Sequence, residues 1–296
     1  GDPSDAVGSD LKGQLCRAGR HCQPPELFGA DRMPWDFDAF GWTEGVTLEA
    51  FEQQQRQAAR HFAALAPGAA APVALHLGAH SLGGGLGRDL HRSWAPWPHR
   101  AVLVEPQSEL LPALQERVDS GEVLGPNASA EIVMAAPGES DAGPSAFYTV
   151  APNLLQDMPL LAHMHQHFCR FRSFSREGLA AALRRECRKF HWLRRCDAWS
   201  SYVAEVQARS LTASSLLREA GVSAASVFAL LLDAVGGDDL ARTEDFLALE
   251  GFRPLLVAFK HSQSPCEEGA RLVRALAAKG YDVWMNGLHI FAVLAE

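Results

Sequence analysis

Four short apolar runs, each followed by a helix-like stretch, constrain the fold of this 296-residue chain more than any other feature. The runs are Val73–Leu77, Ala101–Val104, Val227–Leu232 and Pro254–Phe259. Strands that are apolar almost throughout are buried on both faces, and helices between them are typical of parallel βαβ units. Asn286-Gly287 then separates two final apolar runs and is a strong signal for a hairpin turn. We therefore expect an α/β fold with a doubly wound, mostly parallel sheet and a C-terminal antiparallel hairpin.

The chain divides into two parts by composition. Residues 1–71 are predicted to form an N-terminal irregular arm and a helix, because Gly, Pro and Asp dominate until a helical pattern begins near Thr47. Residues 72–296 form the predicted α/β domain, which is Rossmann-like, with a helical insertion at about 152–202. Within it we also expect a third strand over Ile132–Ala136 and a fourth, at a sheet edge, over Ser145–Val150.

The net charge of −8 is unevenly distributed. Residues 170–195 hold nine basic and two acidic side chains, a local charge of +7. The acidic remainder makes nucleic acid and anionic membranes unlikely partners, and no apolar run approaches the roughly 20 residues of a transmembrane helix. Two interpretations of the basic segment stay open: its arginines pair with the acidic remainder, or it forms a lid that attracts an anionic substrate or a protein partner.

Six cysteines are scattered without a CxxC pair, which predicts free thiols in a reducing compartment, by default the cytoplasm. The start at Gly1 without Met leaves open a cleaved targeting peptide. Asn127-Ala128-Ser129 is a glycosylation sequon, although such triplets are also frequent by chance. His163, His165, His167 and Cys169 could bind zinc, but no further ligand stands at suitable spacing, so we expect a polar helix face and no metal.

In open α/β sheets, ligands bind beyond the carboxyl ends of the strands. The first such end carries a glycine-rich turn from Gly78 to Gly85, which is either a ligand cradle or a plain tight turn. The dinucleotide pattern GxGxxG fails there because its third glycine would fall on Arg88, which argues against NAD. Glu105 ends the second run and can bind a ribose diol or lie on the surface; Asp233 ends the third and can orient a substrate or act as a base.

Five short motifs resemble, in their order, a known enzyme family. They are His76-Leu77-Gly78-Ala79-His80, Val104-Glu105-Pro106, Ala135-Ala136, Phe147-Tyr148 and Asp233-Ala234-Val235-Gly236-Gly237-Asp238. The chain from about Pro72 to Glu296 is similar in this respect to the FkbM-type S-adenosylmethionine-dependent methyltransferases. His76 replaces the acid of the family's first motif, His80 its asparagine, and Val235 the glutamate of its last motif.

The resemblance implies S-adenosylmethionine as cofactor. It would contact Gly78, Ala79, His80, Gly83 and Glu105, with Ala135 and Ala136 near the adenine. Asp233 would lie near the methyl donor, and His80, Asp233 and His261 are the candidate catalytic bases. The implied activity is methyl transfer to a hydroxyl of a small-molecule, sugar or lipid-like acceptor. The alternative is a catalytically lapsed protein of the same fold that acts as a binding or scaffold module.

Overall fold

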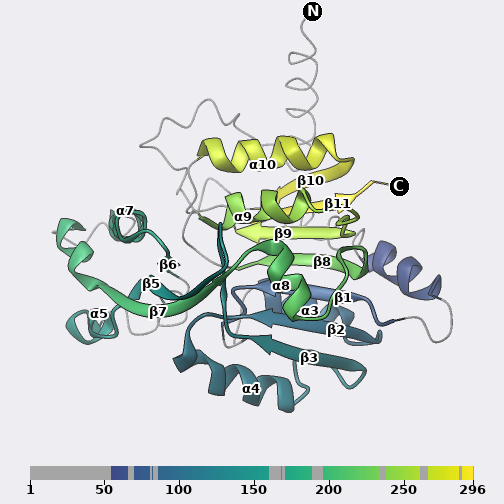
Figure 1. Ribbon diagram of the computed structural model, residues 1–296, viewed down its shortest axis with the longest axis horizontal. Coiled ribbons are helices and arrows are strands. Elements are labelled where there is room, and N and C mark those ends of the chain that lie inside the picture. Colours follow the sequence, from purple (N-terminus) through teal and green to yellow (C-terminus); the bar gives the residue numbers. More distant parts are fainter. Residues whose placement is uncertain are drawn as a thin grey trace, which may run out of the picture.

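A computed structural model of the chain describes residues 55–65, 70–80, 82, 86–159, 168, 171–188, 196–233, 238–260, 266–286 and 289–295. A seven-stranded sheet forms the centre of the molecule, and a smaller four-stranded sheet projects from it (Figure 1). The chain is thus a mixed α/β protein with a mostly parallel central sheet, as the alternating runs predict.

The order of strands in the central sheet is β10-β11-β9-β8-β1-β2-β3. Neighbours pair in parallel except β11, which is antiparallel to both β9 and β10. From β1 the chain first adds β2 and β3 on one side and later adds β8 on the other, so the order reverses between β1 and β8. The bounds are β1 Val73–Leu77, β2 His99–Val104, β3 Ala128–Val133, β8 Val227–Leu232, β9 Leu256–Lys260, β10 Tyr281–Asn286 and β11 His289–Leu294.

Helices cover both faces of this sheet. Along β1 the side chains alternate between two cores: Leu75 lies in the core shared with α8 (Ala213–Glu219), α9 (Asp238–Leu247) and α10 (Cys266–Ala278). Ala74 lies in the other core, with α3 (Leu86–Trp94) and the helix over residues 55–63. Helix α4 (Leu111–Asp119), which follows the short helix η2 (Ser108–Leu110), covers the edge of that second face beside β2. Burial on both faces explains why β1 and β8 are apolar almost throughout.

The four-stranded sheet has the order β4-β7-β5-β6, and its long strands β5 (Ala142–Val150) and β7 (Val203–Leu211) form an antiparallel ribbon. Strand β4 (Ala136–Pro137) joins the ribbon to the end of β3. Beyond it, α5 (Asn153–Asp157), β6 (Arg172–Ser173), α7 (Arg176–Arg188) and η4 (Cys196–Tyr202) gather around a small core of their own. We call the region from β5 to β7 the projecting unit (Figure 1).

Two strand predictions are wrong in part. Residues 145–150 belong to β5 of the second sheet and not to an edge of the central sheet. Strand β3 covers Ala128–Val133 instead of Ile132–Ala136, because this edge strand is only partly buried and so lacks the apolar run of its neighbours.

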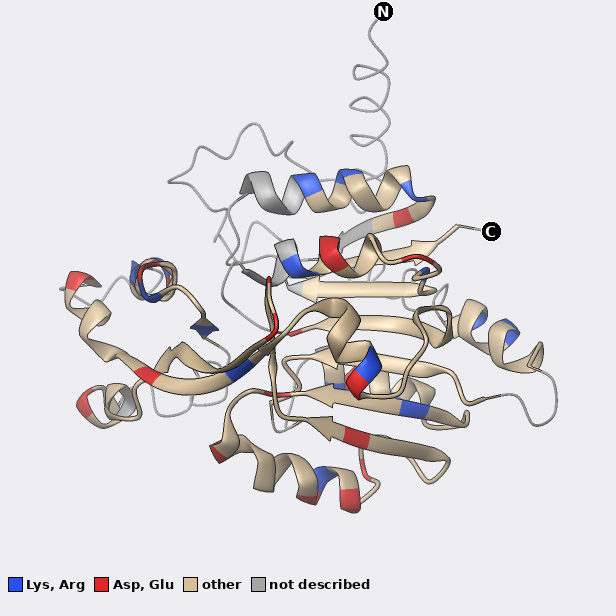
Figure 2. Cartoon of the chain, viewed as in Figure 1, with Lys and Arg blue, Asp and Glu red and all other residues tan. Residues whose placement is uncertain are grey.

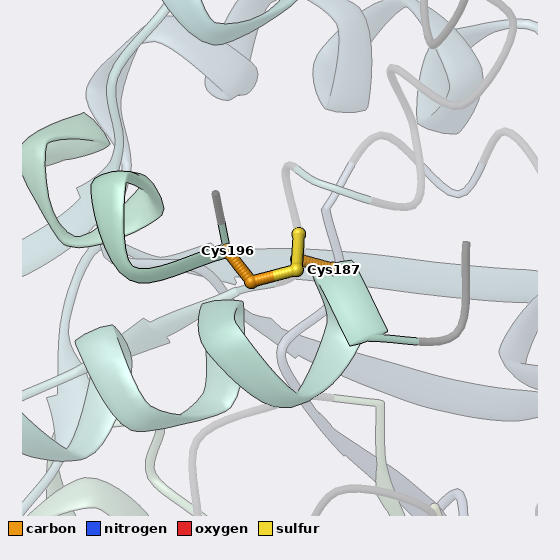
Figure 3. Close-up of a disulfide and its surroundings, with 2 residues drawn as sticks. All are labelled: Cys187 and Cys196. Carbon is orange, nitrogen blue, oxygen red and sulfur yellow. A yellow bond between two sulfur atoms is a disulfide. The ribbon is translucent and has the colours of Figure 1, made fainter. Parts of the chain in front are cut away.

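A disulfide joins Cys187, at the end of α7, to Cys196, at the start of η4, with 5.5 Å between their Cα atoms (Figure 3). The prediction of free thiols is therefore wrong for these two residues. Spacing alone could not reveal the pair, because the fold of the projecting unit brings the two element ends together. The other four cysteine side chains lie outside the described residues. None of the helices within the described ranges has the length and apolar character needed to cross a bilayer.

Candidate functional site

The turn after β1 bends back against the end of β2. Gly78 adopts a φ of +81°, a conformation that favours glycine. The N–H groups of Gly78 and Ala79 both donate to the carbonyl of Val104, at 2.9 and 3.1 Å. His80 follows with a φ of +50°, a conformation uncommon for a residue with a side chain. The turn therefore presents the backbone of His80 to the residue that follows β2.

That residue is Glu105, whose side chain is fully buried. Its Oε2 accepts a hydrogen bond from the backbone N–H of His80 at 2.9 Å. Its Oε1 accepts one from the backbone N–H of Gln107 at 3.0 Å. The glycine turn and the carboxylate thus form one structure, and the alternative of a solvated surface glutamate is wrong.

Arg172 neutralises this carboxylate from the projecting unit. Its Nη1 lies 2.8 Å from Oε1 and 2.7 Å from Oε2 of Glu105, and its side chain is only 5% exposed. Strand β6 carries Arg172 and pairs with β5 through Thr149. Figure 2 shows basic residues on β6 and α7, the described part of the basic segment. For Arg172, the interpretation that this segment pairs with acidic residues elsewhere is confirmed.

Asp233 lies on the opposite side of β1 from Glu105. It follows β8, is 6% exposed, and its backbone N–H donates to the carbonyl of Leu77 at 3.0 Å. Its own backbone carbonyl lies 3.3 Å from Nε2 of His80. His80 also places Nδ1 4.0 Å from Oε2 of Glu105. His80, Glu105 and Asp233 therefore meet where the strand order reverses, the place at which doubly wound sheets bind ligands.

Ala135 and Ala136, the residues predicted near the adenine, are buried by other side chains of the protein. Ala135 belongs to the central core with Leu211 and Ala213, and Ala136 packs with Phe147 and Ala208 in the second sheet. The other two predicted site residues, Gly83 and His261, lie outside the described residues, as does the zinc candidate set His163, His165, His167 and Cys169.

His76, at the position of the family's acid, faces α3 and not the site. Its Nδ1 lies 3.2 Å from Nε2 of His91, whose ring stacks on that of His99 with centroids 6.4 Å apart. Nδ1 of His99 lies 3.0 Å from the carbonyl of Trp97. The absence of a side chain at Gly87 leaves space for the His76 ring, because a Cβ there would lie 2.2 Å from Cε1 of His76.

The sequence did not predict this buried histidine cluster, which consists of His76, His91 and His99. Burial lowers the pKa of His91 well below its ordinary value, and the neighbouring His76 and His99 lower it further. Burial also lowers the pKa of His99, against the opposing effect of the Trp97 carbonyl. The alternation of side chains along β1 could have indicated the position of His76, since it places His76 on the same face as Ala74, which packs in the core beside α3. Within the described residues, no three histidine, cysteine or acidic side chains are placed to hold a metal ion.

No family model, curated protein or solved structure matches this chain.

Proposed function

We propose that the chain is an S-adenosylmethionine-dependent methyltransferase whose cofactor lies across the ends of β1, β2 and β8. The observation that carries the proposal is the hydrogen bond from the N–H of His80 to Glu105, because it joins a glycine turn to the acid of the next strand. A carboxylate held in this way can receive the two hydroxyls of a ribose. The switch in strand order at β1 and β8 supports the same location.

The cofactor fits this site only if Arg172 leaves Glu105. Glu105 would keep its two backbone bonds from His80 and Gln107 and would accept ribose hydroxyls in place of the two bonds from the guanidinium. Removing one partner of a buried ion pair costs about 3–5 kcal/mol when the other stays uncompensated. Hydrogen bonds to a charged group return about 1.5–3 kcal/mol each, so two ribose hydroxyls offset much of that cost. Binding of cofactor would thus be an exchange of partners at Glu105.

The cofactor supplies an electrophilic methyl group on a sulfonium. The protein's part is to hold the acceptor in line with that methyl group, which provides most of the acceleration. A hydroxyl acceptor also needs a base, and His80 and Asp233 are the described candidates because they flank Glu105. We propose a small-molecule, sugar or lipid-like acceptor, and an anionic one would suit the arginines of α7.

The second candidate function is that of a lapsed methyltransferase fold serving as a binding or scaffold module. The Arg172–Glu105 pair favours it, since a buried arginine already fills both carboxylate oxygens. His76 also favours it, because a histidine turned into the core cannot place a negative charge near a methionine amino group.

Calorimetric titration with S-adenosylmethionine and S-adenosylhomocysteine separates the two functions. The methyltransferase predicts micromolar binding that is lost in Glu105→Gln. Glu131→Gln is the matched control, because Glu131 also pairs with an arginine, Arg100, on the central sheet but is partly exposed. Glu105→Gln/Arg172→Gln keeps the test valid if the single variant unfolds, since it removes both buried charges. Binding of neither compound to the folded wild type would favour the scaffold, and a titration with NADH is expected to show no binding.

A further inference from the structure

Asn127 lies in an exposed turn directly before β3. It opens the sequon Asn127-Ala128-Ser129, whose middle residue is not proline, and Ser129 is exposed as well. The chain contains three asparagines, and neither Asn153 nor Asn286 has a serine or threonine two residues later. Any N-linked glycan on this chain must therefore be attached to Asn127.

The Cys187–Cys196 disulfide is an independent observation on the compartment. Disulfides form and persist in oxidising environments, which include the lumen where N-linked glycans are added, and they are rare in the cytosol. This bond is part of the fold of the projecting unit, because Cys187 is fully buried in its core with Leu183 and Trp199. The sequon alone is weak, but the buried disulfide indicates an oxidising compartment, and N-linked glycans are added in one such compartment.

From these two observations we infer that Asn127 is an N-glycosylation site, modified in the oxidising compartment in which Cys187–Cys196 forms. The side-chain amide nitrogen of Asn127 forms a bond to C1 of an oligosaccharide carried on a polyprenyl diphosphate. The C1–oxygen bond to that diphosphate breaks, the lipid diphosphate leaves, and the amide loses one proton. In the same compartment the two thiols pass two electrons and two protons to a disulfide-bearing oxidant.

The fold accommodates the glycan without rearrangement. Nδ2 of Asn127 donates to the carbonyl of Pro96 at 3.3 Å, and a glycosylated amide keeps one N–H for such a bond. Strand β3 lies at the edge of the sheet, so the sugar extends into solvent.

The glycan also lies far from the candidate site. Ala128 pairs with His99 at the start of β2, whereas Glu105 follows the end of that strand. Six residues of strand separate the two positions by about 20 Å. Glycosylation therefore leaves the Glu105 site accessible, and the inference does not depend on the proposed function.

Peptide mapping of the full chain purified from its own cells tests the inference. We expect the peptide with Asn127 to carry a glycosidase-sensitive sugar, and the peptides with Cys187 and Cys196 to be linked before reduction. In cells that express variants of the chain, Asn127→Gln and Ser129→Ala should lose the mass shift. Ser129→Thr and Asn153→Gln should keep it, because the first preserves the sequon and the second removes an asparagine outside it.

An unmodified Asn127 in the native protein would overturn the inference, whether or not the disulfide is present. A mass shift that persists in Asn127→Gln would overturn it as well, because the sugar would then be attached elsewhere. Both readouts come from denatured peptides, so they remain valid for a variant that folds poorly.

Discussion

Strand β1 and the turn that follows it place two histidines, His76 and His80, in buried surroundings of opposite kinds. His80 lies at the carboxyl end, beside the charged pair of Glu105 and Arg172, which depends on a residue from the projecting unit. His76 lies within the strand and belongs to the buried histidine cluster, with His91 of α3 and His99 of β2. The charged pair can exchange a partner for a ligand, whereas the histidine cluster is enclosed by packed side chains. This difference indicates that the charged pair, and not the histidine cluster, is suited to binding a ligand.

Breaking the charged pair should have the largest effect on stability. Arg172→Met leaves Glu105 buried without its counter-ion and should lower the free energy of unfolding by about 3–5 kcal/mol. Urea denaturation measures this loss. Arg100→Met, which removes a partly exposed pair with Glu131, should cost about 0–1 kcal/mol. If both variants lost the same free energy of unfolding, the buried pair would contribute no more to stability than the partly exposed pair.

Removing the disulfide should affect the two sheets differently. Cys187→Ser/Cys196→Ser frees a loop with a sequence separation of nine residues, which should cost about 2–3 kcal/mol. Because the bond lies in the projecting unit, hydrogen exchange should accelerate in β5 and β7 more than in β1 and β8. Equal acceleration in both sheets would show that the projecting unit does not open on its own.

The packing of the histidine cluster can be tested at Gly87. Gly87→Ala places a methyl group against the ring of His76 and should cost about 1–3 kcal/mol. Gly143→Ala is the control, since no atom lies within 4 Å of its Cβ position. The added substitution His76→Ala should relieve the clash. A Gly87→Ala variant as stable as the wild type would show that His76 is not held as described.

Two members of the histidine cluster, His91 and His99, should also make stability dependent on pH. The pKa values of His91 and His99 are lowered in the folded state, so the unfolded chain takes up protons first as the pH falls below about 6.5. The free energy of unfolding should therefore decrease with falling pH, by at most about 1.4 kcal/mol per pH unit for each histidine. Denaturation of wild type and His91→Leu between pH 7.5 and 5 should give a smaller slope for the variant. Identical slopes would mean that His91 is not buried as the neutral form.

Sequence patterns predicted the central sheet because its strands are buried on both faces; β1 and β8 have the expected bounds. The meeting of His80, Glu105 and Asp233 was also predictable, since all three follow strands whose carboxyl ends share one edge. Arg172 was not predictable as their partner, because it lies 67 residues from Glu105 and no spacing rule links them. The histidine cluster escaped for a similar reason, as its members come from β1, α3 and β2.

The affinity of Arg172→Gln for S-adenosylhomocysteine, measured by calorimetry beside wild type and Arg100→Gln, tests the exchange at Glu105 most directly. If ribose hydroxyls must displace the guanidinium, Arg172→Gln should bind about tenfold more tightly than wild type or better, a gain of about 1.4 kcal/mol, and Arg100→Gln should equal wild type. Unchanged or weaker binding by a folded Arg172→Gln protein would contradict a cofactor site at Glu105.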